Sequence, residues 1–290
     1  MIRFLKDSKI NFVSQFKYAK YLSYSLIILG FILYFFKGPT LGIDFKGGTE
    51  VIVKLNDNLS TKEQVVTYLN DKSIKFSNIK TYGNDKIRIL FENDMNQSLI
   101  NKNFYVVSYN KIGSTISSDL KYDALKALSI ALLLIGLYII IRFDWYSAIG
   151  SIFALFHDIL IVMTLLILFS FEFNVNIIAA FLIIIGYSLN DTIVIFDRMR
   201  ENIYEYSNME LSEIINLSLN ETFNRTIITS ITTLFVVNSL FIFGGGSLRG
   251  LSFALIVGVL SGTYSSIFVS TPIMMFLRDK YYVEENEREI

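Results

Sequence analysis

The chain contains no cysteine, one histidine and two prolines among its 290 residues. Without cysteine it can form no disulfide, thiolate metal site or cysteine nucleophile. A single histidine, His157, and the lack of an HExxH pattern argue against a zinc hydrolase, and no pair of nucleophile and base supports an enzyme. Basic and acidic residues number 26 each, and this balance argues against nucleic-acid binding. We therefore expect no cofactor, no metal and no enzymatic activity.

Apolar residues are abundant, at 52% of the chain, and the mean hydropathy of +0.48 is high for a soluble domain of this length. Six apolar runs are long enough to cross a bilayer, and they lie at residues 21–36, 124–141, 145–171, 175–196, 226–243 and 250–277. No small-residue cleavage site follows the first run, so we expect an uncleaved anchor. The sequence predicts a polytopic α-helical membrane protein with six transmembrane helices.

A polar insert, residues 40–118, separates the first two runs and is patterned as a small α+β domain. Alternating apolar residues predict strands at 49–55, 78–82, 86–91 and 104–109, with a hairpin at Gly83-Asn84-Asp85. A capping box formed by Ser60 and Glu63 predicts a first helix, and a second is expected near 95–101. The order β-α-β-β-α-β is that of a ferredoxin-like fold.

Lysine and arginine residues predict the orientation, because they accumulate in cytoplasmic loops. Arg142, Arg225 and the basic residues near both ends fall on one side of the predicted spans, so both termini are expected in the cytoplasm. The expected domains are a cytoplasmic N-terminus with the first span at 1–39, an extracytoplasmic domain at 40–118, five spans at 119–279 and a cytoplasmic tail at 280–290.

The connection between the fourth and fifth spans has an amphipathic pattern. Ser207 and Glu210 predict a capping box, and the apolar residues that follow share one helical face: Leu211, Ile214, Ile215 and Leu219. Such a helix either lies on the membrane surface or packs against the underside of the bundle. The sequence leaves both alternatives open.

Asp191 is the one charged residue between residues 175 and 196. A carboxylate at this depth costs roughly 2.5–3.5 kcal/mol on insertion scales, so an intramembrane ionisable group predicts a functional site. The polar residues around it are Ser188, Asn190 and Thr192. A proton- or ion-handling site is the first hypothesis. The alternative is a carboxylate that neighbouring hydroxyls satisfy and that only holds helices together.

Two further charged residues belong to this hypothesis. Arg225 begins the fifth span, with Thr229 on the same helical face, and a guanidinium on a neighbouring helix could pair with Asp191. Its alternative role is that of a basic anchor at the cytoplasmic interface. Asp158 follows His157 within the third span and is a second buried carboxylate, either part of a proton wire or a structural partner.

Glycines predict two structural features. Small residues recur every four positions in the sixth span, at Ala254, Gly258, Gly262, Ser266 and Ser270, which favours close helix packing within this bundle or with a partner subunit. A junction rich in glycine joins the first span to the insert, with Gly42, Asp44, Gly47 and Gly48. A phosphate-binding loop is not expected there, because we predict that a strand rather than a helix follows.

These motifs together resemble the SecF subunits of the SecD/SecF family, which belongs to the RND superfamily. The family's glycine-aspartate-glycine-glycine junction is matched at residues 42–48. Its Gly-Tyr-Ser-x-Asn-Asp-Thr-Ile-Val run is matched at 186–194 and its Asp-Arg-x-Arg-Glu-Asn run at 197–202. The Arg-Thr-x-x-Thr-Ser segment is matched at 225–230, and the His-Asp pair at 157–158.

The resemblance covers the whole chain and implies one half of an RND-like membrane domain with a ferredoxin-like extracytoplasmic domain. It implies a multi-pass protein of the bacterial plasma membrane that works with a SecD-like subunit, the Sec translocon and translocating preproteins. It also implies that Asp191 and Arg225 take part in export driven by the proton motive force. The alternatives are a half-size RND-type exporter and a passive scaffold of the translocon.

Overall fold

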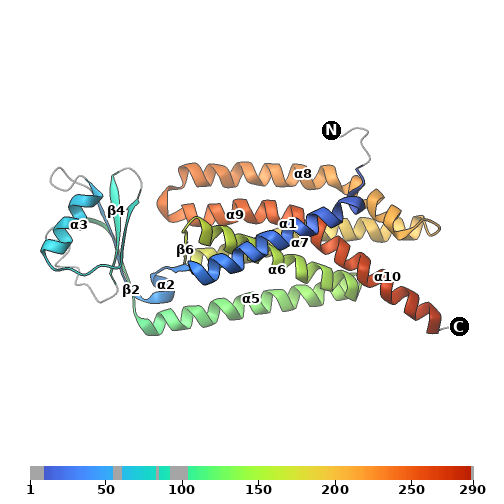
Figure 1. Cartoon of the computed structure of the whole chain (residues 1–290), viewed down its shortest axis with the longest axis horizontal. Coiled ribbons are helices and arrows are strands. Elements are labelled where there is room, and N and C mark those ends of the chain that lie inside the picture. The colour runs from blue at the N-terminus through green and yellow to red at the C-terminus, as the bar shows by residue number, and fades with distance from the viewer. Residues whose placement is uncertain (1–9, 55–60, 83–84, 92–103, 289–290) are drawn as a thin grey trace.

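The computed structural model describes residues 10–54, 61–82, 85–91 and 104–288. Six long helical spans within these residues form a bundle, and a small domain lies at one end of it (Figure 1). The spans are α1 (Phe12–Phe36), α5 (Ser114–Arg142), α6 (Trp145–Leu168), α7 (Val175–Glu205), α8 (Leu211–Phe243) and a last composite helix. The predicted six-span α-helical architecture is thus confirmed.

The last span is a composite helix that contains a π-helical turn. It consists of α9 (Gly245–Ser265), the π-helical turn η1 (Ser266–Ser270) and α10 (Thr271–Arg288). Single π-helical turns inside long helices are frequent at functional sites, because they redirect side chains and free backbone groups. Here the turn begins at Ser266, which belongs to the predicted small-residue stripe.

Polar residues cap the starts of two helices. α1 begins at Phe12, nine positions before the predicted run, since the side chain of Asn11 accepts a hydrogen bond from the Ser14 amide. α7 begins after Asn174, whose side chain accepts from the Ile177 amide at 3.2 Å. Polar caps satisfy backbone donors that an apolar run leaves unpaired.

The amphipathic connector packs against the bundle and does not form a separate surface helix. α8 runs without interruption from Leu211 to Phe243, so the connector is the first part of the fifth span. Ile215 and Leu219 are buried in a cluster with Phe12 and Met199. The predicted capping box is wrong, because Glu210 occupies the N-cap position and makes no side-chain cap bond.

The small domain is a four-stranded antiparallel sheet with a helix on it. Its strands are β2 (Gly48–Lys54), β3 (Asn78–Tyr82), β4 (Lys86–Phe91) and β5 (Tyr105–Ile112), in the spatial order β3-β4-β2-β5. This is the strand order of a split β-α-β fold, in which the first strand of the domain, β2, lies between β4 and β5. The helix α3 (Lys62–Asp71) inserts Val65 and Leu69 into the sheet core. The second predicted helix, near 95–101, lies outside the described residues.

Helix α3 begins one residue later than predicted. Thr61 is the N-cap, and its hydroxyl accepts from the Gln64 amide while the Gln64 side chain accepts from the Thr61 amide. The capping box is therefore formed by Thr61 and Gln64 in place of Ser60 and Glu63. The two patterns are adjacent in the sequence, and only the register of the helix decides between them.

The glycine junction fastens the small domain to the bundle. β1 (Thr40–Leu41) pairs in parallel with β6 (Glu172–Phe173), which lies between α6 and α7. A four-residue helix, α2 (Ile43–Lys46), lies within the junction, and the predicted strand follows the junction as β2, which begins at Gly48. Gly47 has a φ of 77°, a conformation that favours glycine, and turns the chain from α2 into β2.

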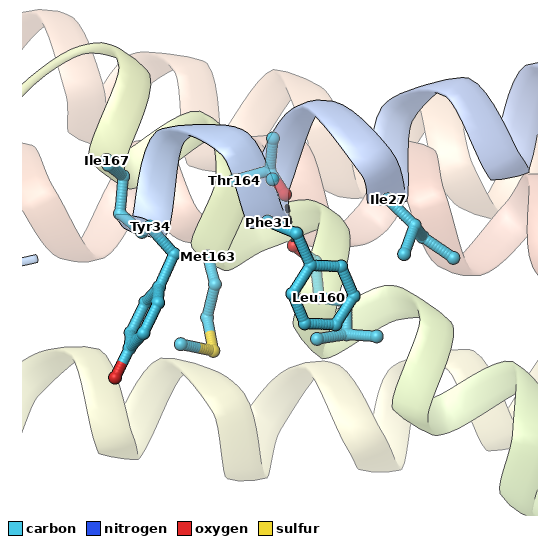
Figure 2. Close-up of a pocket in the computed structure, with 8 residues that line it drawn as sticks. Ile27, Phe31, Tyr34, Leu160, Met163, Thr164 and Ile167 are labelled. Atoms are coloured by element: carbon cyan, nitrogen blue, oxygen red, sulfur yellow. Dashed lines mark hydrogen bonds between the residues drawn. The ribbon is translucent and has the colours of Figure 1, made fainter. Parts of the chain in front are cut away.

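An apolar cavity of about 180 Å³ lies between α1 and α6 (Figure 2). Its lining includes Ile27 and Phe31 of α1 and Met163 of α6. The hydroxyl of Thr164 is bonded to the Leu160 carbonyl of its own helix at 2.7 Å. The other polar side chain in the lining is Tyr34, and the remaining lining residues are apolar.

Candidate functional site

Asp191 lies on α7 with 3% of its surface exposed. Its Oδ2 atom has no hydrogen-bond partner among the described residues. The neighbouring Thr192 hydroxyl is engaged elsewhere, with the Ser266 hydroxyl at 2.9 Å and the Ser188 carbonyl at 3.2 Å. A buried polar group without a partner costs free energy, so this oxygen is held ready for a proton or another donor.

Arg225 lies on α8, which packs against α7, but its side chain forms no ion pair with Asp191 in the described part of the chain. The side chain of Arg225 is exposed on the outside of this bundle. Thr229 accompanies it and bonds back to the Arg225 carbonyl at 2.9 Å. The structure thus places Asp191 and Arg225 on neighbouring helices, without an ion pair between them.

Asn190 is also exposed, on the outer face of α7. Exposed polar and charged side chains within a membrane span are costly in contact with lipid. Asn190 and Arg225 are therefore candidates for contact with another membrane subunit. Of the predicted polar neighbours, Ser188 and Thr192 point into this bundle and Asn190 points away from it.

Asp158 lies on α6, is completely buried and has a full set of hydrogen bonds. Three serine hydroxyls donate to its carboxylate: Ser188 of α7 at 2.7 Å, Ser261 of α9 at 2.6 Å and Ser265 of α9 at 2.8 Å. The His157 Nδ1 atom is the fourth neighbour, at 3.3 Å. The two buried carboxylates thus differ: Asp158 is saturated with partners and Asp191 is not.

His157 connects this cluster to α1. Its Nε2 atom lies 3.1 Å from the Ser23 hydroxyl, which lies 3.0 Å from the Tyr264 hydroxyl. The Tyr264 hydroxyl donates to the Ala19 carbonyl at 2.6 Å, and its ring stacks on the imidazole with centroids 5.9 Å apart. A continuous hydrogen-bonded path therefore joins α1, α6, α7 and α9.

Gly258 and Gly262 bring α9 close to α7. A Cβ atom at Gly258 would overlap the Ile184 side chain, and one at Gly262 would press against Ser188. The small-residue stripe thus faces this bundle's own α7. The close approach is what allows serine hydroxyls of α9 to reach Asp158 beside α7.

Asp44 links the glycine junction to α7. Its Oδ2 atom accepts a hydrogen bond from the Val175 amide at 2.8 Å, at the N-terminus of the helix that carries Asp191. The Gly42 amide donates to the Phe173 carbonyl at 2.8 Å, and a side chain at Gly42 would crowd that carbonyl. Gly47 and Gly48 both have positive φ and provide the turn into β2.

Sequence reasoning missed an ionic clasp between the small domain and the bundle. Arg88 of β4 donates to Glu50 of β2 and to Glu172, and Lys80 of β3 lies 3.1 Å from Glu172. It also missed Ser23, Ser261, Ser265 and Tyr264 in the buried network. Ser261 and Ser265 are four residues apart, next to the small-residue stripe. This spacing predicts that they share one helical face, but it does not predict which residue they contact.

Comparison with known proteins supports this architecture. A model of the C-terminal region of SecD/SecF protein export membrane proteins matches residues 92–280, and a model of the SecD/SecF GG motif matches residues 34–58. Protein translocase subunit SecF of Rhodothermus marinus is 43% identical over 96% of this chain and 96% of its own length. The SecF subunit of Helicobacter pylori strain 26695 is 35% identical over 98% of this chain and 93% of its own.

Solved structures agree in fold and sequence. The crystal structure of SecDF, a translocon-associated membrane protein from Thermus thermophilus, matches 95% of this chain with a TM-score of 0.86 and 32% identity. A SecDF structure in a super-membrane-facing form matches 98% of the chain with a TM-score of 0.74 and 30% identity. This chain spans 40% and 41% of those two SecDF chains. It belongs to the SecD/SecF family of protein export membrane proteins, as a multi-pass membrane protein of the SecF type.

Proposed function

We propose that this chain is the SecF half of a SecD/SecF complex that uses the proton motive force to assist protein export by the Sec translocase. The observation that carries the proposal is Asp191, a carboxylate buried at membrane depth with an oxygen that has no partner. The names of the relatives favour protein export over a half-size exporter or a passive scaffold. We propose that the coupling ion is the proton and not the sodium ion.

The chemistry of the site supports a switch between two charge states. When Asp191 is ionised, its carboxylate attracts the Arg225 guanidinium of the neighbouring α8. When it is protonated, that attraction is lost and the two helices can separate. A unit charge that crosses the membrane potential yields about 2.3 kcal/mol per 100 mV, which is sufficient to bias two conformations of similar energy.

A single helix, α7, links the site to the extracytoplasmic domain. Asp191 lies on the helix whose first amide is bonded to Asp44 of the junction, and Glu172, just before that helix, is bonded to Arg88 of the sheet. A shift of α7 would therefore move the domain directly. We propose that this movement acts on a preprotein segment during the late stage of its translocation.

The membrane arrangement implies a partner. Arg225 and Asn190 are exposed on the outside of the bundle, and a SecD-like subunit is proposed to cover them and complete the site. Lipid and the SecYEG-like channel are the other expected contacts. Both termini are proposed to be cytoplasmic, with residues 40–118 outside the plasma membrane, from the bias of lysine and arginine.

The test is late-stage export into inside-out membrane vesicles with and without a proton gradient. Asp191→Asn mimics the protonated form, so the variant should assemble normally and lose the stimulation by the gradient. Asp197→Asn is the matched control, because Asp197 lies on the same helix, is half-exposed and pairs with Arg142 at 3.0 Å. Wild-type stimulation of the Asp191→Asn vesicles would refute the proposal. A sodium gradient applied in place of protons identifies the coupling ion.

A further inference from the structure

The network around His157 and Asp158 contains a buried ionisable pair that the proposed function does not use. We propose that both ring nitrogens of His157 are protonated, and that this imidazolium and the ionised Asp158 form a standing ion pair. The pair fixes α1, α6, α7 and α9 to one another beside Asp191. The hydrogen bonds around the pair require these protons.

The donors and acceptors next to α1 can be assigned one by one. The Tyr264 hydroxyl lies 2.6 Å from the Ala19 carbonyl, which can only accept, so the phenolic proton is used there. The Ser23 hydroxyl, 3.0 Å away, must then donate its own single proton to the Tyr264 oxygen. The His157 Nε2 atom lies 3.1 Å from the Ser23 oxygen and must therefore carry a proton.

The other side of the ring is determined by Asp158. Ser188, Ser261 and Ser265 each donate a hydroxyl to its carboxylate at 2.6 to 2.8 Å. The Ser265 hydroxyl also lies 3.2 Å from the Gly262 carbonyl, but the carboxylate at 2.8 Å is the closer acceptor for its single proton. Three donated hydrogen bonds favour the ionised carboxylate over the acid, which would have to donate one bond itself. An ionised carboxylate only accepts. The Nδ1 atom of His157, 3.3 Å from Oδ1, is consequently a donor as well.

A histidine with two N–H groups is an imidazolium, and its charge is balanced by Asp158. A lone charge in this interior would be costly, whereas the countercharge and the further donors around Asp158 offset the cost of desolvation. The ring faces both ways: one N–H points toward α1 and the other toward the carboxylate on its own helix. Among the common side chains, only the imidazolium presents two donors on opposite edges of a rigid ring.

The pair also explains why Ser188 is held in place. Its hydroxyl donates to Asp158, and its carbonyl accepts from Thr192 and from Ser266 at the start of the π-helical turn. Ser188 lies one helical turn before Asp191. His157 is therefore a positioning residue that acts on Asp191 through Asp158 and Ser188. This last step rests on the proposed function, whereas the charge state of His157 does not.

Nuclear magnetic resonance can test the charge state directly, because His157 is the one histidine of the chain. The chain is labelled with ¹⁵N-histidine, without a polyhistidine tag, and is combined with an unlabelled partner. The labelled ring nitrogens are then those of His157 alone. We expect both to show the chemical shift of a protonated nitrogen at neutral pH. One unprotonated nitrogen would overturn the proposal, whatever the outcome of the export assay.

A double-mutant cycle provides a second measurement. His157→Gln leaves the Asp158 carboxylate without a countercharge, and Asp158→Asn leaves the imidazolium without one, so each should lower the Tm in detergent. The neutral double variant should recover part of that loss. A double variant that loses the sum of the two single effects would contradict an ion pair. If the variants do not fold, the resonance measurement on wild type still decides.

Thr164→Ala is the matched control for both measurements. Thr164 is a buried hydroxyl on the same helix α6, and it bonds to the Leu160 carbonyl outside the network. Its removal should leave the histidine resonances unchanged. If the proposed function fails in the Asp191→Asn assay while both ring nitrogens prove protonated, the ion pair stands as a structural centre and only its link to Asp191 is lost.

Discussion

Two aspartates lie at similar burial in this bundle, and their surroundings give them different chemistry. Asp158 accepts from three serines, so its charge is stabilised where it lies. Asp191 has a carboxylate oxygen with no partner among the described residues, and its nearest cation is on a different helix. A group whose charge is poorly stabilised can be switched by a small movement, whereas a saturated one cannot.

At the residue scale, the charge of Arg225 is expected to be essential. Arg225→Met should reduce the stimulation of export by a proton gradient to the level of vesicles without a gradient, because Asp191 then has no cation to attract. Arg225→Lys should retain part of the stimulation, since a lysine keeps the charge. Arg249→Met is the control, because Arg249 is an exposed arginine at the other end of the bundle. Full activity of Arg225→Met would exclude a role as the sensor of Asp191.

At the scale of single elements, the contact between α7 and α9 holds the site together. Gly262 of α9 allows the backbone of α7 to approach at Ser188, which in turn reaches Asp158. The stripe was compatible with packing in this bundle or against a partner, and the structure places it in the bundle. We propose that a SecD-like partner instead covers the outer face, where Asn190 and Arg225 are exposed.

Gly262→Leu should destabilise the chain by about 1–3 kcal/mol, because the larger side chain cannot fit without moving α7. The measurement is thermal unfolding of the detergent-solubilised chain. Gly186→Leu is the matched control, since a Cβ atom at Gly186 of α7 would meet open space. Equal Tm values for the two variants would show that the close approach at Gly262 does not contribute to stability.

At the scale of the whole molecule, the sheet domain lies at one end of the bundle (Figure 1), and two groups of polar contacts among the described residues join the two parts. One is the junction with Asp44, and the other is the clasp of Arg88, Glu50, Glu172 and Lys80. The clasp lies in a cleft of about 650 Å³ between the sheet and the segment that joins α6 to α7. Because the clasp is partly buried, its opposite charges attract one another strongly. Removal of one charged residue would leave another without a partner, which costs free energy.

Removal of the clasp should loosen the domain. Arg88→Ala leaves Glu50 and Glu172 close together without their shared cation, and the expected loss is about 3 kcal/mol. Hydrogen exchange of β4 and of the α6–α7 connection measures the effect locally. Lys54→Ala is the control, because Lys54 and Asp85 form an exposed pair at 3.6 Å, for which roughly 0–1 kcal/mol is expected. Unchanged exchange in Arg88→Ala would rule out the clasp as an attachment.

The proposed topology can be tested with single cysteines, since the chain has none. A cysteine at the exposed Lys72 of the sheet domain should react with a membrane-impermeant reagent from the extracytoplasmic side. One at Tyr204, which is 91% exposed at the other end of α7, should react from the cytoplasmic side. Labelling of both from the same side would show that the assumed orientation is wrong.

The sequence by itself determined the six spans, the four strands and the candidate charges. Apolar runs and period-two patterns follow from burial in lipid or in a core, and both are local properties of the chain. Asp191 could be identified because an isolated charge in an apolar run is unusual whatever the fold. Helix starts were less certain: the caps at Asn11 and Thr61 depend on side-chain geometry.

Only the tertiary structure decided which polar groups meet. Ser23, Ser188 and Ser261 come from three helices far apart in the sequence, and no local pattern distinguishes them from other serines in apolar spans. Their convergence on His157 and Asp158 depends on the crossing of helices at glycines. The difference between Asp158, which has several hydrogen-bond donors, and Asp191, which has an oxygen without one among the described residues, is likewise decided by packing. The hydrogen bonds form between helices, whereas the sequence shows only which residues are neighbours along one helix.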